Sequence, residues 1–186
     1  MKHLVLFASG SGSNVENIHD KFASEPIQID CVFVNNPHAG VIDRCIRLGI
    51  PYKLFNREEW NNGQVLKDLL HYSPDLIVLA GFLWKMPPSI IQSFNQKIIN
   101  IHPSLLPKFG GKGMYGHFVH EAVIASNEKE SGITIHWVNQ QYDEGGIIFQ
   151  SHCEITENDN PESLAQKIHQ LEFQYFPEII KNILNK

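Results

Sequence analysis

Strand-length apolar runs alternate with helical patterns over the first hundred residues, and this alternation restricts the fold more than any other feature. The runs are HLVLFAS (3–9), IQIDCVFVNN (27–36), YKLF (52–55), DLIVLAG (75–81) and KIINIH (97–102). Apolar side chains recur at helical spacing in 15–22, 41–48 and 58–72, and Pro87-Pro88 fit the first turn of a helix through Phe94. Such alternation predicts βαβ units with right-handed crossovers and a parallel sheet.

The second half of the chain has a different order of elements. After the glycine-rich loop KFGGKGMYG we expect a helix at 117–125, strands at 132–139 and 146–155, and a last helix from Pro161. Two strands joined by a short turn with two glycines are antiparallel. We therefore predict an α/β, Rossmann-like fold, a mostly parallel mixed sheet with helices on both faces, in a single domain over residues 1–186.

Composition excludes several functional classes. With 42% apolar residues, 19% charged residues and a formal charge of −5, the chain is typical of a globular protein. None of its 15 Lys and Arg residues forms a run, which argues against nucleic-acid binding. No apolar stretch reaches about 18 residues, so we expect no membrane segment. The three cysteines lack CxxC spacing and are expected to be free thiols, with Cys31 and Cys45 in the core, in a reducing cytoplasm.

The first candidate site is the loop GSGSN at 10–14, between the first strand and the first helix. Amides of such a loop and of the helix N-terminus attract an anion. The dinucleotide fingerprint is incomplete, because Val15 replaces its third glycine and asparagines replace the acid after the second strand. These residues favour a phosphate over NAD, although a tight capped turn explains them equally well.

The second candidate is the NIH segment at the end of strand 97–102. Side chains alternate along a strand, so Asn100 and His102 face the same side, at the sheet edge where α/β proteins bind ligands. An amide donor beside a titratable imidazole suits oxyanion stabilisation and proton transfer, as acyl transfer requires. The alternative is a pair of residues that caps the following loop.

Other polar residues carry weaker indications. The turn YDEGG holds Asp143, a carboxylate that would raise the pKa of His102 if it lay near, although Asp and Gly also favour turns for local reasons. His117 and His120 lack the other ligands of a zinc motif, so we predict no metal site. His136 either reaches the site or is a hydrogen-bonded strand residue. Ser104 lacks the GxSxG context of a serine hydrolase.

Taken in order, five motifs resemble one family. GSGSN at 10–14, LAGF at 79–82, NIHPSLLP at 100–107, SGITIHWV at 131–138 and DEGG at 143–146 resemble the phosphoribosylglycinamide formyltransferases of purine synthesis. The resemblance extends from residue 4 to about residue 180 and implies a formyltransferase fold. It also implies 10-formyltetrahydrofolate as co-substrate, glycinamide ribonucleotide as acceptor and no metal ion.

The resemblance implies a role for each matching residue. Asn100, His102 and Asp143 match the catalytic trio, while Gly12, Ser13 and Asn14 match the contact with the substrate phosphate and Glu172 matches an acid that holds the substrate. The folate pocket is matched by Arg57, Leu83, Trp84, Lys85, Met86, Asn139, Gln140, Gln141 and Tyr142. Trp84 and Lys85 depart from the more usual Arg and aliphatic residue, and the GGKGMYGH loop is longer than is common.

Four alternatives remain open at this point. A formyltetrahydrofolate hydrolase shares the trio but carries an additional N-terminal domain, and a transfer-RNA formyltransferase carries a basic C-terminal domain. A sugar-nucleotide formyltransferase shares the same core. A non-catalytic folate- or nucleotide-binding module is a further alternative, against which the intact trio argues.

Overall fold

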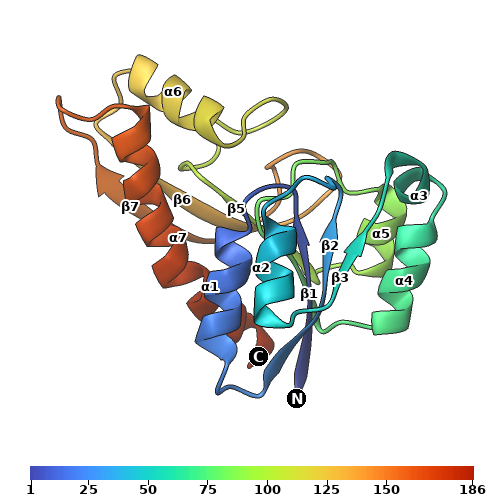
Figure 1. Cartoon of the computed structure of the whole chain (residues 1–186). Helices are drawn as coiled ribbons and strands as arrows, with labels where there is room; N and C mark the ends of the chain where they lie inside the picture. Colours follow the sequence, from blue (N-terminus) through green and yellow to red (C-terminus); the bar gives the residue numbers. More distant parts are fainter.

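A computed structural model describes residues 1–186 and contains one seven-stranded sheet in the order β3-β2-β1-β4-β5-β6-β7 (Figure 1). The strands are β1 (Lys2–Ala8), β2 (Ile27–Val34), β3 (Tyr52–Leu54), β4 (Leu76–Leu79), β5 (Ile98–His102), β6 (Glu130–Trp137) and β7 (Ile147–Glu154). Strands β1 to β5 pair in parallel, whereas β6 and β7 are antiparallel to their neighbours. The predicted mostly parallel, mixed sheet is confirmed.

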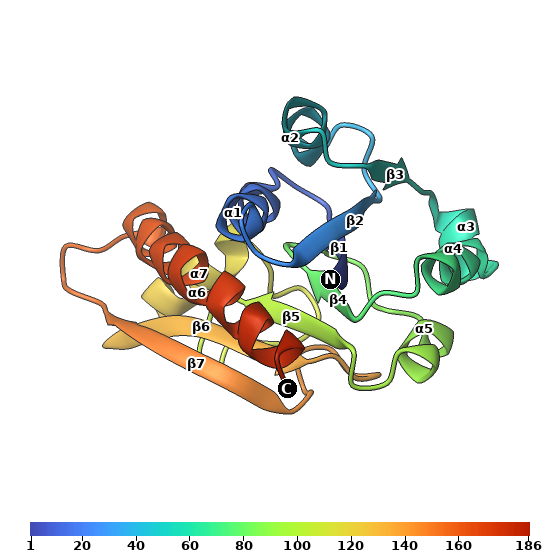
Figure 2. The same cartoon turned by 90° about the horizontal axis from the view of Figure 1, so that it is seen from below.

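Helices cover both faces of this sheet, as predicted (Figure 2). They are α1 (Ser13–Phe22), α2 (Val41–Leu48), α3 (Arg57–Asn61), α4 (Gln64–Tyr72), α5 (Pro88–Ser93), α6 (His117–Ala125) and α7 (Pro161–Leu184). Buried apolar residues of α1, α2, α6 and α7 belong to one apolar cluster, and those of α3, α4 and α5 belong to the other. No helix is both long and apolar enough to cross a membrane.

The two apolar clusters follow from the period of a strand. In β1, Leu4 and Leu6 belong to a cluster of 27 buried residues on one face, while Val5 and Phe7 belong to a cluster of 15 on the other. All four side chains are fully buried. A strand with helices on both faces must be apolar at every position, which explains the continuous runs in the sequence. Cys31 and Cys45 are buried free thiols, one in each cluster, as predicted.

The helix predicted for 58–72 is wrong in one respect, because it is two helices. Asn56 caps α3 through a reciprocal pair of hydrogen bonds with Glu59, and α3 ends at Asn61. Gly63 then adopts a left-handed conformation, φ 86°, before α4 begins at Gln64. Glycine adopts this conformation without steric cost, so the chain changes direction there.

The topology locates a crevice at the carboxyl ends of the central strands. From β1 the chain proceeds to β2 and β3 on one side, whereas β4 and β5 lie on the other. Loops that leave β1 and β4 therefore separate above the sheet, and α/β proteins bind ligands at such a point. The amide of Ser9 donates to the carbonyl of Gly81 and joins the two loops at the base of the crevice.

Candidate active site

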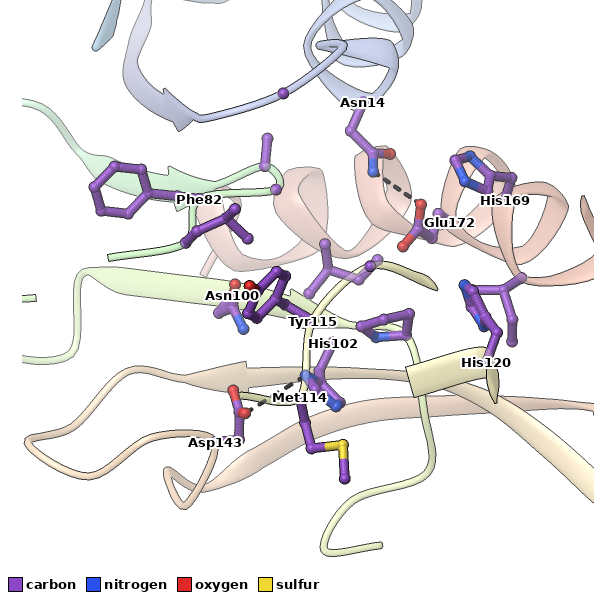
Figure 3. Close-up of a pocket in the computed structure, with 18 of the residues that line it drawn as sticks. Asn14, Phe82, Asn100, His102, Met114, Tyr115, His120, Asp143, His169 and Glu172 are labelled. Carbon is purple, nitrogen blue, oxygen red and sulfur yellow. Dashed lines mark hydrogen bonds and ion pairs between the residues drawn. The ribbon is translucent and has the colours of Figure 1, made fainter. Parts of the chain in front are cut away.

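A cavity of about 560 Å³ occupies this crevice. Its wall comes from the loops after β1, β4 and β5, the glycine-rich loop before α6, the turn between β6 and β7, and residues of α6 and α7 (Figure 3). Nine residues predicted from the sequence line it: Gly12, Ser13, Asn14, Leu83, Asn100, His102, Tyr142, Asp143 and Glu172. These residues are more than 150 positions apart at the extremes, and the fold brings them together.

The GSGSN loop forms one end of the cavity. Gly12 is the N-cap of α1 and has φ 78°, and a Cβ at this position would overlap Val41 of α2. No side chain caps the helix, and its first backbone hydrogen bond is donated by Glu16 to the Gly12 carbonyl. The preceding amides at the N-terminus of α1 are therefore available to an anion.

Asn14 and Glu172 meet at the same end of the cavity. The Asn14 amide donates to Glu172 Oε2 at 3.0 Å, and both side chains are buried. Burial raises the pKa of the Glu172 carboxyl, and the hydrogen bond from Asn14 opposes this effect. The two residues that the resemblance gave to substrate binding thus form one polar contact between α1 and α7.

One ring nitrogen of His102 is hydrogen-bonded to the backbone, and the other is not. Its Nε2 lies 2.7 Å from the carbonyl oxygen of Phe109, which can only accept, so Nε2 carries the proton. Nδ1 then bears a lone pair in the neutral ring and lies 3.6 Å from Asp143 Oδ2. Burial lowers the pKa of His102, although the Asp143 carboxylate opposes the effect. The unprotonated nitrogen is therefore the one nearest the carboxylate.

Asp143 is oriented by the turn that carries it. Its backbone is left-handed, φ 56°, and the amide of Gly111 donates to Oδ2 at 2.9 Å. Burial alone would raise the pKa of Asp143, but His136 and His102, whose protonated rings favour the carboxylate, and the Gly111 amide hold it below its usual value. The carboxylate is ionised at neutral pH and faces the free nitrogen of His102.

Asn100 is oriented by His136 of the neighbouring strand. His136 Nδ1 donates to the carbonyl of Trp137 at 2.9 Å, so Nε2 of the neutral ring accepts from the Asn100 amide at 3.1 Å. The same Nε2 lies 3.6 Å from Asp143 Oδ1. His136 is thus a buried, hydrogen-bonded residue of β6 that is also in contact with two members of the trio, so each of the two alternatives for it holds in part.

Comparisons with known proteins show the family of this chain. The family model described as formyl transferase matches residues 2–180. The chain belongs to the formyl transferase family. It is 36% identical to phosphoribosylglycinamide formyltransferase of Bacillus subtilis, over 99% of this chain and 95% of that protein. The resemblance found in the sequence is confirmed.

Two further relatives extend the comparison. The chloroplastic phosphoribosylglycinamide formyltransferase of Arabidopsis thaliana is 38% identical over 96% of this formyl transferase, which spans only 64% of the plant protein. A solved phosphoribosylglycinamide formyltransferase from Anaplasma phagocytophilum superposes with a TM-score of 0.90 at 33% identity, covering 99% of this chain and 87% of that one. The Rossmann-like formyltransferase fold is therefore shown.

The residues matched to folate lie on the segment after β4, on the turn before Asp143 and, for Arg57, on α3. Leu83 and Tyr142 line the cavity, and Lys85 Nζ lies 5.6 Å from the centroid of the Tyr142 ring, which brings the segment after β4 against the turn before Asp143. The Arg57 guanidinium lies 3.6 Å from the centroid of the Trp84 ring. In that turn, Asn139 accepts from the Gln141 amide, and Gln140 and Gln141 are exposed.

Met86 differs from the other matched residues. Its side chain is 3% exposed and belongs to the apolar cluster with Phe82 and Ile90, so this side chain is not available to a ligand. Trp84 packs edge-on against Trp60, with ring centroids 6.1 Å apart, and extends this cluster toward the surface. The aromatic residue in place of the usual Arg is thus accommodated by a preformed aromatic layer.

Two histidines of the formyl transferase cavity were not predicted as site residues, His120 of α6 and His169 of α7. His169 lies three residues before Glu172, a spacing that places both on one side of a helix and could have indicated it. In the sequence, His120 stands out only as a partner of His117 in an incomplete zinc motif. The structure holds no cluster of three or more His, Cys, Asp or Glu residues suited to a metal ion.

Proposed function

We propose that this protein transfers the formyl group of 10-formyltetrahydrofolate to the primary amine of glycinamide ribonucleotide, a step of purine biosynthesis. The observation that supports it most is the meeting of His102 Nδ1 with Asp143 Oδ2, 3.6 Å apart beside Asn100 on one cavity wall. Two proton acceptors and one amide donor at a single point suit the attack of an amine on a formyl carbon.

The ends of the cavity suit the two substrates. We assign the substrate phosphate to Gly12, Ser13 and Asn14, where free amides of α1 face the cavity, and the remainder of the ribonucleotide to Glu172. The folate lies along the segment Leu83 to Met86 and the turn Asn139 to Tyr142. Arg57, stacked on Trp84, offers a cation at the outer edge of this segment.

The reaction begins when the nitrogen lone pair of the substrate attacks the formyl carbon. A carbon–nitrogen bond forms, the carbonyl electrons move to oxygen, and the Asn100 amide donates to that oxyanion. The amine proton passes to His102 Nδ1, where Asp143 stabilises the resulting imidazolium. Protonated His102 then also donates to the oxyanion. Collapse of the intermediate breaks the bond to the folate nitrogen, which receives the proton, and formylated ribonucleotide and tetrahydrofolate leave.

We further propose that residues 1–186 act as one formyltransferase domain in the cytoplasm. The ligands are small molecules, the mechanism uses no metal ion, and no nucleic acid takes part. The formal charge of −5 agrees with a local anion site rather than a broad basic surface.

The trio is tested by two variants, His102→Ala and Asp143→Asn. Each should lower kcat for formyl transfer by about 10²-fold or more, because each removes an interaction that is strongest in the transition state. Circular dichroism would establish that both variants fold. If either folded variant transfers formyl at close to the wild-type rate, the assignment of the trio is wrong.

A further inference from the structure

His120 is a buried imidazole on the cavity wall whose hydrogen bonding the trio does not explain. It lies on α6 and is 4% exposed, yet Nδ1 has no hydrogen-bond partner and no contact with solvent. Buried polar atoms in proteins are nearly always paired, because an unpaired one lowers stability. Because His120 also lines the cavity, we expect its ring to turn toward a bound ligand, which then supplies the missing partner.

The residues around His120 indicate which part of a ligand it meets. Figure 3 shows His120 beside the wall of α7 that carries His169 and Glu172, with Asn14 of α1 on the far side of Glu172. The remaining imidazole of the cavity, His102, lies at the end of β5. The end of the cavity that holds His120, His169 and Glu172 is the one that the N-terminus of α1 reaches.

Few cationic groups compete with His120 for an anion. Lys112 is the only Lys or Arg among the lining residues, and it lies on the exposed glycine-rich loop. Glu172 is already bonded by Asn14 and suits hydroxyl groups rather than an anion. Of the polar groups in glycinamide ribonucleotide, the phosphate is the one that favours helix amides and imidazole N–H donors.

The charge state of His120 agrees with such a role. Burial lowers the pKa of His120 to about 4, and the nearby rings of His169, His102 and His117 lower it as well. The ring is therefore neutral at pH 7 in the free protein and offers one N–H donor without a fixed charge. A phosphate beside it would supply the acceptor that the protein lacks.

We infer that His120 is a specificity-determining residue that hydrogen-bonds the substrate phosphate, opposite the amides of the α1 N-terminus. This inference rests on the proposed function for the identity of the substrate. It adds a side chain from α6 to a phosphate site that the sequence motif confines to residues 12–14. His120 takes no part in the chemical step, so its effect falls on substrate affinity.

Calorimetric titration with ribose 5-phosphate tests the inference without any turnover. In His120→Phe, which retains a planar ring but no donor, binding should weaken by about 10- to 100-fold, the size expected for one hydrogen bond to a charged group. His120→Asn places an amide nitrogen near the position of Nδ1 and should recover most of the affinity. His117→Phe, on the same helix but exposed, should bind as the wild type does.

Kinetics separate His120 from the trio. The KM for glycinamide ribonucleotide should rise in His120→Phe, while kcat and the KM for 10-formyltetrahydrofolate stay within about threefold of wild type. Unchanged ribose 5-phosphate binding in folded His120→Phe would overturn the inference, as would an equal loss for ribose, which carries no phosphate. Failure of the proposed function is a different result, since wild-type protein would then bind ribose 5-phosphate but form no formylated product.

Discussion

At the scale of single residues, the Phe109 carbonyl decides what His102 can do. By accepting from Nε2 it confines the proton of the neutral ring to that nitrogen and leaves Nδ1 as the base. Asp143 then faces a lone pair in the resting protein and an N–H after proton transfer. The NIH motif alone predicted the pair of side chains, but a backbone carbonyl seven residues later determines which nitrogen reacts.

The titration of His102 can be predicted from its surroundings. Burial, which disfavours the charged ring, lowers its pKa below 6.5 despite Asp143. In Asp143→Asn the favourable carboxylate is lost, so the pKa of His102 should fall further. Nuclear magnetic resonance of the labelled ring in both proteins would measure this. A wild-type pKa of 6.5 or above, or a rise in the variant, would contradict the account.

His136 is predicted to act by holding Asn100. His136→Phe removes the acceptor of the Asn100 amide, so kcat should fall by about 10- to 100-fold with little change in either KM, because the donor is misplaced only where the oxyanion forms. Steady-state kinetics would measure this, with His38→Phe, an exposed site, as the control. A fall confined to KM would argue for a role in binding instead.

At the scale of elements, the join between β1 and α1 depends on one glycine. Gly12→Ala forces a Cβ into Val41 at a left-handed position, so we expect a loss of about 1–3 kcal/mol in unfolding free energy. The KM for glycinamide ribonucleotide should also rise. Gly10→Ala is the matched control, because nothing lies within 4 Å of a Cβ there and its φ is ordinary. Denaturant titration giving equal stabilities for the two variants would contradict this.

Element types were largely predictable and their limits were not. Continuous apolar runs identified the central strands, and Pro161 marked the first turn of α7, because local sequence determines both features. The division of 58–72 into α3 and α4 was missed, since the helical spacing of apolar residues continues across Gly63. The break arises because Gly63 adopts a left-handed backbone conformation, which interrupts the helix. A glycine within an apolar pattern of helical spacing does not by itself reveal that conformation.

At the scale of the whole molecule, the site is assembled from distant segments that local patterns cannot connect. Strand period and the rule for α/β crevices predicted that Asn100 and His102 face the ligand-binding edge of the sheet. Contacts from α6 and α7 were beyond such reasoning, because they depend on how helices pack against each other. His120 is the clearest case, since nothing in its own sequence separates it from an ordinary buried helix residue.

Stability should depend on pH through the buried histidines. For His120 the pKa is about 4 in the folded protein and about 6.5 unfolded, so the unfolded chain binds more protons between these values. Unfolding free energy should therefore fall as pH decreases from about 6.5 to 4, by up to about 2–3 kcal/mol from this residue. Denaturant titrations at several pH values should show a shallower fall of unfolding free energy with decreasing pH in His120→Phe than in the wild type. An equal fall in both proteins would refute the low pKa of His120.

The central claim is that this cavity transfers a formyl group to glycinamide ribonucleotide. The direct measurement supplies purified protein with 10-formyltetrahydrofolate carrying an isotopically labelled formyl carbon, with and without the ribonucleotide, and follows the label by mass spectrometry. We predict that the folate is consumed only when the ribonucleotide is present and that the label appears on its amine. Consumption without the ribonucleotide and release of labelled formate would contradict the account and indicate a hydrolase.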